Sequence, residues 1–264
     1  MKVKEQTIHK HGFVRLIDVM GDDSSIADAA RVSYGTGTRS VSDNRNLIRY
    51  LVRHKHTSPL EMVEVKFHLK LPIFVMRQLV RHRTASLNEY SGRYSIMSDD
   101  CYVPELDYIQ PQSKTNNQGR SDDGLSDRWK ARYQETINDI RYKCLVAYNF
   151  LIGNESVEHG GLTRELARTV LPVSNYTECY WKIDLHNFFH YAKLRGDSHA
   201  QWEIQELAKI MYRLVNMVFP IACEAFEDFI ENSVTISRME KDLLKRIIST
   251  DRWDDVVNDF LRIL

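Results

Sequence analysis

Three arginines, a histidine, a glutamate and several hydroxyl groups lie within fifteen residues, at 81–95 (RHRTASLNEYSGRYS). Guanidinium groups bind phosphate through paired hydrogen bonds, and small residues such as Ser91 and Gly92 let backbone NH groups approach an anion closely. This segment therefore predicts a site for a nucleotide phosphate. A solvated basic loop after a helix has a similar composition, because arginine is favoured at helix C-termini. The residues of this segment alone do not decide between the two.

A second polar cluster, at 194–205 (LRGDSHAQWEIQ), places Arg195 at the expected end of one helix and His199 at the start of the next. Both have ordinary structural explanations, with Arg195 as a helix C-terminal charge and His199 as a surface side chain behind a cap at Asp197. Arg168, on another expected helix, is equally ordinary by itself. The composition of this cluster therefore leaves its role open.

Two HxH pairs suggest a metal site, one at His54 and His56 within HKHTSPLE and the other at His9 and His11. Zinc needs a third and usually a fourth ligand with supporting hydrogen bonds, and no HExxH or other complete signature is present. We therefore expect no metal. The sequence also lacks GxGxxG, a Walker loop and GxSxG, so a pyrophosphate would have to be held by arginine side chains and helix ends.

The spacing of apolar residues predicts the elements that must position these clusters. Residues 62–71 alternate almost perfectly and predict a half-buried strand, with further strands at 13–19 and 177–183. Residues 84–97 are expected to form an ordered loop, and the stretches 35–42 and 110–126 mobile loops. Helices are expected at 22–33, 43–55, 72–83, 129–151, 163–171, 185–195, 198–218, from Pro220, from a capping box of Ser237 and Glu240 through 248, and after Asp251.

Composition indicates one soluble globular domain with a sizeable core. Lys+Arg and Asp+Glu both total 36, so any anion site is local and no overall field favours nucleic acid. Four scattered cysteines without a CxxC pair fit a reducing compartment, and we expect the cytosol. The elements predict an α+β fold, a helix-rich single domain around a modest mixed or antiparallel sheet (residues 1–230), with C-terminal helices (231–264) packed on it.

The segment 81–95 resembles the RHRxxSxNxxSxR signature of flavin-dependent thymidylate synthases. The similarity extends from about residue 12 to residue 226 and includes HKHTSPLE, PIFVMRQ, ELARTVLP and LRGDSHAQWEIQ. It leaves the C-terminal helices uncovered. Every fixed position of the signature matches: Arg81, His82, Arg83, Ser86, Asn88, Ser91 and Arg93.

This resemblance implies a homotetramer with active sites shared between subunits and with FAD as the bound cofactor. The family transfers a methylene group from 5,10-methylenetetrahydrofolate to dUMP and takes hydride from NADPH through the flavin, which gives dTMP. No protein nucleophile attacks the uracil ring in this family, in agreement with the lack of a cysteine in an activated setting. The expected partners are dUMP, folate, NADPH and further copies of the chain, with neither nucleic acid nor a membrane.

By position in the matching motifs, one set of residues is expected to bind dUMP and another to bind FAD. Arg195 is the expected catalytic residue, since the family residue there promotes ionisation of the uracil ring NH. Arginine is always protonated, so it must act by stabilising the developing anion. The dUMP set is Gln78, Arg81, Glu89, Ser91, Gly92, Arg93, Arg168 and Arg195. The FAD set is His56, Ser58, Glu61, Arg81, His82, Arg83, Glu89, Asp184, His186, His190, Leu194 and His199.

The helix before Arg195 departs from the family pattern. Family members usually read NxRxxxN or NxRxxxH there, whereas this chain has Asp184, His186 and His190. His190 is an accepted alternative, but Asp184 replaces an amide by a carboxylate, and His186 replaces a permanent cation by a titratable one. We expect the chain still to bind FAD through the arginine loop, and any effect of these replacements to be weaker binding.

Two other functions fit parts of the sequence. A metal-dependent phosphohydrolase would use the two HxH pairs, need added metal and purify colourless. A noncatalytic nucleotide-binding or RNA-binding module would use the basic, tyrosine-containing segment, but zero net charge and the absence of an RNP-like aromatic pattern weigh against it. Neither explains the joint occurrence of all the matched segments.

Overall fold

The computed structural model describes residues 4–33, 43–114, 119–121, 124–153 and 160–247. The loop expected at 35–42 and the segment after Asp251 lie outside the described residues. Part of the excursion expected at 110–126 lies outside them as well.

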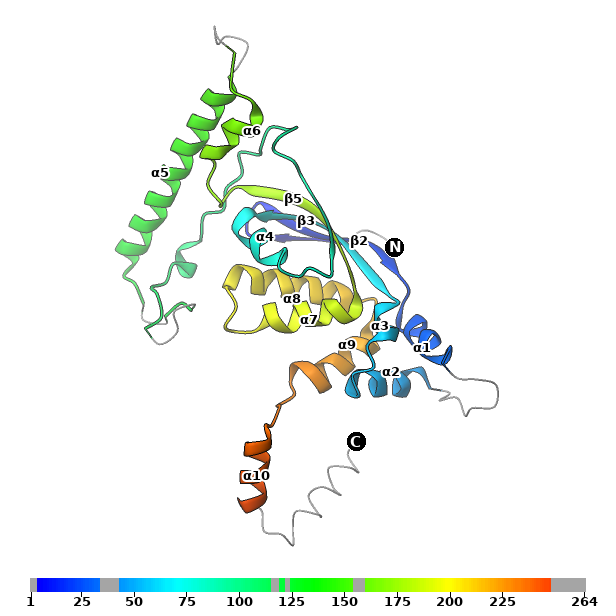
Figure 1. Ribbon diagram of the computed structural model, residues 1–264. Coiled ribbons are helices and arrows are strands. Elements are labelled where there is room, and N and C mark those ends of the chain that lie inside the picture. Colours follow the sequence, from blue (N-terminus) through cyan, green and yellow to red (C-terminus); the bar gives the residue numbers. More distant parts are fainter. Residues whose placement is uncertain (1–3, 34–42, 115–118, 122–123, 154–159, 248–264) are drawn as a thin grey trace.

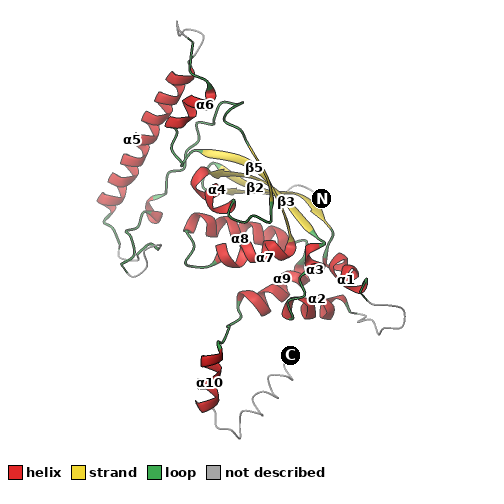
Figure 2. Cartoon of the chain, in the orientation of Figure 1, coloured by secondary structure: helices red, strands yellow, loops and turns green. Residues whose placement is uncertain are grey.

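A five-stranded antiparallel sheet forms the centre of the chain, in the order β1-β2-β3-β5-β4 (Figure 1, Figure 2). The middle strand β3 buries Val65, Phe67 and Leu69 on one face, as the alternation of its sequence predicts. Phe67 lies opposite Trp181, so a one-residue slip would turn this apolar face to solvent. The expected α+β fold is confirmed. The strands are β1 Lys4–Ile8, β2 Gly12–Met20, β3 Glu64–Pro72, β4 Ser86–Glu89 and β5 Tyr176–Asp184.

Helices α4, α7 and α8 pack on one face of the sheet and bury Phe188 and Tyr191 against it (Figure 1). Helices α1, α2, α3 and α9 pack on one another beside this layer, with α9 also against α8 and α3 against α7. The helices are α1 Asp23–Arg31, α2 Asn44–Arg53, α3 Ser58–Glu61, α4 Ile73–Leu79, α5 Asp127–Ile152, α6 Arg164–Ala167, α7 Leu185–Gly196, α8 Trp202–Asn216, α9 Pro220–Phe226 and α10 Arg238–Ile247. Short 3-10 turns at Leu106–Tyr108 and Arg168–Val170 and a π-helical turn at Glu227–Glu231 complete the described elements.

The segment 84–97, expected as a loop, contains strand β4, and this prediction was wrong. β4 pairs with β5, with Ser86 opposite Lys182 and Glu89 opposite Cys179. All four of its side chains are exposed, so no alternation of apolar residues marks the strand in the sequence. Strand β1 was also not predicted.

Three helix boundaries differ from the prediction. The helix expected at 72–83 ends at Leu79. The helix expected at 163–171 ends at Ala167 and continues as a 3-10 turn, because Leu171 precedes Pro172 and adopts an extended backbone with ψ 136°. The helix expected from residue 198 begins only at Trp202. The residues between α7 and α8 therefore form a connection that holds polar side chains of the second cluster.

The long helix expected at 129–151 is present as α5, but its apolar stripe is not covered. Of the side chains of α5, only Tyr148 is fully buried within the described residues. Trp129, Ile140 and Phe150 are each more than half exposed. Such an apolar face on a folded chain indicates a contact surface.

The capping box predicted at the start of the C-terminal helix is confirmed. The backbone N–H of Ser237 donates to Glu240 Oε2 at 2.7 Å, and the backbone N–H of Glu240 donates to Ser237 Oγ at 3.3 Å. Helix α10 extends away from the sheet (Figure 1). The division near residue 230 into a domain and a packed extension stays a prediction.

Candidate active site

The arginine segment begins where α4 ends, and it is fixed at its other end by the sheet. Arg81 and Arg83 are exposed, and neither guanidinium makes a hydrogen bond or ion pair with any residue in the described part of the chain. Strand β4 then pairs with β5, and Thr177 Oγ1 donates to Glu89 Oε1 at 2.8 Å. The segment therefore carries two cations without partners among the described residues and, further along the chain, a positioned carboxylate.

A cavity of about 360 Å³ lies beside this segment and is lined by Arg77, Glu89, Gly92 and Arg168, among others. We call it the Arg168 cavity. A Cβ atom at Gly92 would lie 2.7 Å from Met97 Sδ and 3.3 Å from Arg168 Cδ. Glycine at this position therefore lets the backbone and the Arg168 side chain approach each other. Three residues of the predicted dUMP set, Glu89, Gly92 and Arg168, line this cavity. The guanidinium of Arg168 and the accessible backbone at Gly92 are groups that bind phosphate.

Two further residues of the dUMP set lie next to this cavity in the chain. The Ser91 hydroxyl accepts a hydrogen bond from the backbone N–H of Arg93 at 3.3 Å. Arg93 Nε donates to Glu165 at 2.8 Å, and both side chains are 55% exposed. An ion pair this exposed contributes little free energy, so Arg93 can exchange this partner for an anion at low cost.

Arg195, at the C-terminal end of α7, contacts both the arginine segment and α4. Its Nε donates to His82 Nε2 at 3.0 Å, and its Nη2 donates to the backbone oxygen of Gln78 at 3.3 Å. His82 and Arg195 are 113 residues apart in the sequence. The fold thus brings the two sequence clusters into direct contact.

The imidazole of His82 is held in its neutral form. It is 9% exposed and packs edge-on against Tyr191. Burial, and to a smaller extent the neighbouring charges of Arg195 and His190, lower the pKa of His82 from 6.5 to about 4. A neutral imidazole can accept the Arg195 N–H at Nε2, which a protonated one cannot. The contact with Arg195 therefore requires this low pKa.

A chain of hydrogen-bonded polar groups that begins at the buried Glu203 fixes the side chain of Gln78, and sequence reasoning missed it. Glu203 is 2% exposed and accepts from Arg120 Nη2 at 2.6 Å. Gln201 Nε2 donates to Glu203 at 2.8 Å, and Gln78 Nε2 donates to Gln201 Oε1 at 2.6 Å. Because a carboxylate only accepts, it sets the direction of both amides. Gln201 and Glu203 lie within the matched cluster, but nothing in the sequence pairs them with Gln78.

A second cavity, of about 480 Å³, brings together three residues of the predicted FAD set, His56, His186 and His190. We call it the His190 cavity. Two lysines, Lys55 and Lys193, also line it, and no acidic residue does so among the residues that the structure describes. A partly apolar cavity of this size with a basic rim fits part of an anionic, ring-containing cofactor.

Other residues of the FAD set lie outside this cavity. Ser58 and Glu61 are exposed at the two ends of α3, and Leu194 is 49% exposed on α7. Asp184 caps α7: its two oxygens accept from the backbone N–H and the side-chain amide of Asn187, at 2.8 and 2.7 Å. Its carboxylate therefore already has a structural role.

His199 is also apart from the other predicted FAD residues. Its ring Nδ1 lies 2.8 Å from Asp197 Oδ1, and that carboxylate also accepts the backbone N–H of His199. The side chain is 79% exposed. Within the described chain it therefore faces solvent.

Seven of the eight predicted dUMP residues form two groups, and the eighth, Arg81, has an exposed side chain. One group lines or borders the Arg168 cavity, and the other consists of Gln78 and Arg195 with their partner His82. Among the described residues, no hydrogen bond or ion pair joins one group to the other. Helix α4 takes part in both, since its Met76 and Arg77 line the Arg168 cavity and its Gln78 contacts Arg195.

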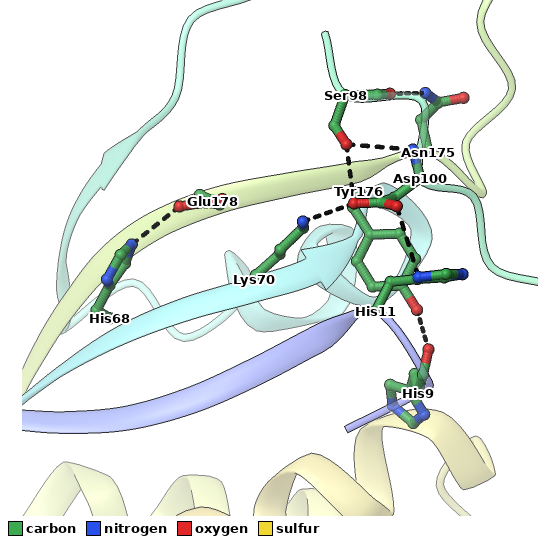
Figure 3. A network of polar contacts seen from close by, with 9 residues as sticks. All are labelled: His9, His11, His68, Lys70, Ser98, Asp100, Asn175, Tyr176 and Glu178. Carbon is green, nitrogen blue, oxygen red and sulfur yellow. Dashed lines mark hydrogen bonds and ion pairs between the residues drawn. The ribbon is translucent and has the colours of Figure 1, made fainter. Parts of the chain in front are cut away.

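The HxH pair at His9 and His11 borders a polar network at the sheet (Figure 3), in which His11 faces Asp100 while the His9 ring Nε2 lies 2.8 Å from the backbone oxygen of Glu203 in α8. Asp100 accepts from Lys70 at 2.7 Å and lies 3.5 Å from His11 Nδ1, while the Tyr176 hydroxyl donates to the backbone oxygen of His9. Within the described residues, no group of three or more His, Cys, Asp or Glu side chains is arranged to hold a metal ion. The HxH pairs therefore have no additional ligands in this part of the chain.

Three of the four cysteine thiols, those of Cys101, Cys179 and Cys223, are unsuited to nucleophilic attack. Burial raises the pKa of Cys179 and of Cys223 to about 12 each, and it raises the pKa of Cys101 as well. A thiol attacks as its thiolate, so these side chains are unreactive at neutral pH.

None of the described helices is long and apolar enough to span a bilayer.

Comparison with known proteins identifies relatives over most of the chain. The sequence profile of a family described as "Thymidylate synthase complementing protein" matches residues 15–221. A flavin-dependent thymidylate synthase from Ruegeria pomeroyi is 50% identical over 239 residues, which cover 90% of this chain and 78% of that protein. Another from Rickettsia bellii is 45% identical over 248 residues, which cover 92% of this chain and 84% of that protein.

Solved structures share the fold. A UMP/dUMP methylase, PolB from Streptomyces cacaoi, bound with 5-Br UMP, superposes with a TM-score of 0.73 at 32% identity, covering 84% of this chain and 96% of that one. The same methylase bound with 5-Br dUMP gives a TM-score of 0.72.

Proposed function

The chain belongs to the family of flavin-dependent thymidylate synthases, and from this premise we propose how its own residues divide the work of making dTMP from dUMP. The enzyme takes its carbon from 5,10-methylenetetrahydrofolate and its hydride from NADPH. When bound, FAD supplies the hydride-transfer chemistry. The observation that carries the assignment is the 3.0 Å contact between Arg195 and His82, because it unites the two motif clusters in one site.

Arg195 stabilises negative charge on the pyrimidine ring. A guanidinium has five N–H donors and stays protonated, so it acts as a fixed cation and not as a base. Two donors are used, one on His82 and one on the Gln78 backbone, which leaves three for the substrate. The two contacts hold the guanidinium in place before substrate arrives, which is the condition for effective electrostatic stabilisation of a developing anion.

Arg168 and the backbone at Gly92 bind the phosphate of dUMP. The supporting observation is their close approach in the Arg168 cavity, which a side chain at position 92 would prevent. Ser91 adds a hydroxyl next to this backbone. Arg93 binds the same phosphate after leaving Glu165, its exposed partner.

FAD binds across the arginine segment and the His190 cavity. Arg81 and Arg83 supply cations that are free of ion pairs within the described chain, and His56, His186 and His190 line the cavity. His82 packs beside His190, with the ring centroids 6.3 Å apart, so it lies where the two regions meet. The basic residues and the size of the cavity are what support this proposal.

The active enzyme is a homotetramer in which subunits complete each other's sites. The Arg168 cavity and the Arg195 group each hold part of the dUMP set, and no hydrogen bond or ion pair joins them among the described residues. A second copy that supplies its Arg195 group to the Arg168 cavity would complete the site. The exposed apolar stripe of α5 provides surface for such contacts.

The enzyme works in the cytosol. All four cysteines are free thiols, which suits a reducing compartment.

The visible spectrum of the purified chain tests the proposal. We expect bound flavin to remain after free FAD is removed, and NADPH to bleach its absorbance in the absence of oxygen, faster when dUMP is present. A colourless protein that takes up no FAD would contradict the proposal. Hydrolysis of phosphate esters that required added metal would instead favour the metallohydrolase.

A further inference from the structure

One wall of the His190 cavity comes from the C-terminal part of the chain. On one side lie His56, His186 and His190, which were expected to bind FAD. On the other side lies the segment 229–235, which we call the C-terminal wall. The family profile matches only as far as residue 221, so this wall lies beyond it. The wall residues that line the cavity are Phe229, Ile230, Ser233, Val234 and Thr235.

The C-terminal wall is anchored to two helices. Lys193 of α7 donates from its Nζ to the backbone oxygen of Ile230. The Arg49 guanidinium of α2 lies 4.9 Å from the ring centre of Phe229 and forms an ion pair with Asp228 at 2.7 Å. These contacts hold the start of the wall in place without any cofactor.

The far end of the wall is open to solvent. Val234 lines the cavity and is 86% exposed, so its apolar side chain has no cover within the described chain. Ile236, two residues later, is 52% exposed and does not line the cavity. An apolar residue at the mouth of a basic cavity would be buried by a ligand that carries both a ring system and phosphates.

We infer that the C-terminal wall is part of the FAD site and binds the cofactor by apolar contact through Val234, with Lys193 and Lys55 facing its phosphates. The inference rests on the proposed function. It assigns a role to residues that lie beyond the end of the family profile at residue 221. These contacts also offset two departures from the family pattern, since Asp184 is occupied as a helix cap and His186 is not a permanent cation.

A matched pair of substitutions tests the inference. Val234→Asp places a carboxylate at the mouth of the cavity, and Ile236→Asp places the same charge two residues away, outside it. We expect the dissociation constant for FAD, measured by flavin fluorescence on the full-length chain, to rise at least tenfold for Val234→Asp and less than twofold for Ile236→Asp. If both variants bound FAD as tightly as the wild type, the inference would be overturned. An equal loss of FAD affinity in the two variants would overturn it as well.

Amide hydrogen exchange on the unaltered chain provides a second measurement in case Val234→Asp fails to fold. We expect FAD to slow exchange in a peptide covering 229–236 at least severalfold, and to leave a peptide from α10 unchanged. Bound FAD with no protection of 229–236 would overturn the inference but leave the proposed function intact. Failure of the unaltered chain to bind FAD would instead refute the proposed function.

Discussion

The buried imidazole of His82 should destabilise the folded chain at mildly acidic pH. Replacing His82 by glutamine should abolish this effect. The pKa of His82 is about 4 in the folded chain and 6.5 when unfolded. Between these values the unfolded chain binds a proton that the folded chain does not, so the free energy of unfolding falls as the pH falls from 6.5 towards 4. The pKa difference corresponds to about 3 kcal/mol in full, and to about 2 kcal/mol at pH 5.

Urea unfolding at pH 7.5 and at pH 5, at one protein concentration and without FAD, measures this contribution. Glutamine does not titrate and still offers Arg195 an acceptor. Between pH 7.5 and pH 5, the free energy of unfolding of His82→Gln should therefore fall by about 2 kcal/mol less than that of the wild type. His199→Gln is the matched control, because the His199 side chain is 79% exposed. The free energy of unfolding of this variant should fall by as much as that of the wild type. Equal losses for His82→Gln and the wild type would refute the argument that burial keeps this imidazole neutral for Arg195.

Three further predictions concern the reaction itself. Arg195→Met should lower the rate of dTMP formation by about 100-fold to 1,000-fold while FAD stays bound, and an unchanged turnover number would exclude the proposed electrostatic role. Arg168→Met should raise the dissociation constant for dUMP by about tenfold to 100-fold in calorimetry, whereas Arg164→Met, on the preceding helix α6 and outside the cavity, should not; similar effects of both would point to a general loss of charge. Iodoacetamide at neutral pH should leave Cys179 and Cys223 unmodified and the rate unchanged, because both thiols have a pKa of about 12, and inactivation traced to either of them would contradict this.

The sequence predicted those features of the fold that depend on strong local patterns. The alternation through Val65, Phe67 and Leu69 predicted the central strand, because a buried face imposes period two on its residues. The helix at Ser237 was predicted from its capping box for the same local reason. Strand β4 was not predicted, because backbone pairing to β5 holds it in place while all its side chains are exposed. A strand of this kind shows no alternation of apolar residues in the sequence.

The candidate site was predicted residue by residue, but its geometry was not. The motifs predicted Arg195 and His82, yet their contact spans 113 residues and results from the packing of both α7 and α4 on α8 and the sheet. The Gln201 and Glu203 chain was missed because it is defined by hydrogen bonds between distant elements. The exposure of the α5 stripe, typified by Phe150, was also hidden, since helical periodicity identifies an apolar face without saying what covers it.

The most direct test of the account is whether this chain forms dTMP. Purified protein is incubated without oxygen with dUMP, FAD, NADPH and 5,10-methylenetetrahydrofolate, and the nucleotides are separated and quantified. The account predicts dTMP in the complete mixture and none when dUMP, NADPH or the folate is omitted. A chain that binds FAD and dUMP but leaves dUMP unmethylated in the complete mixture would contradict it.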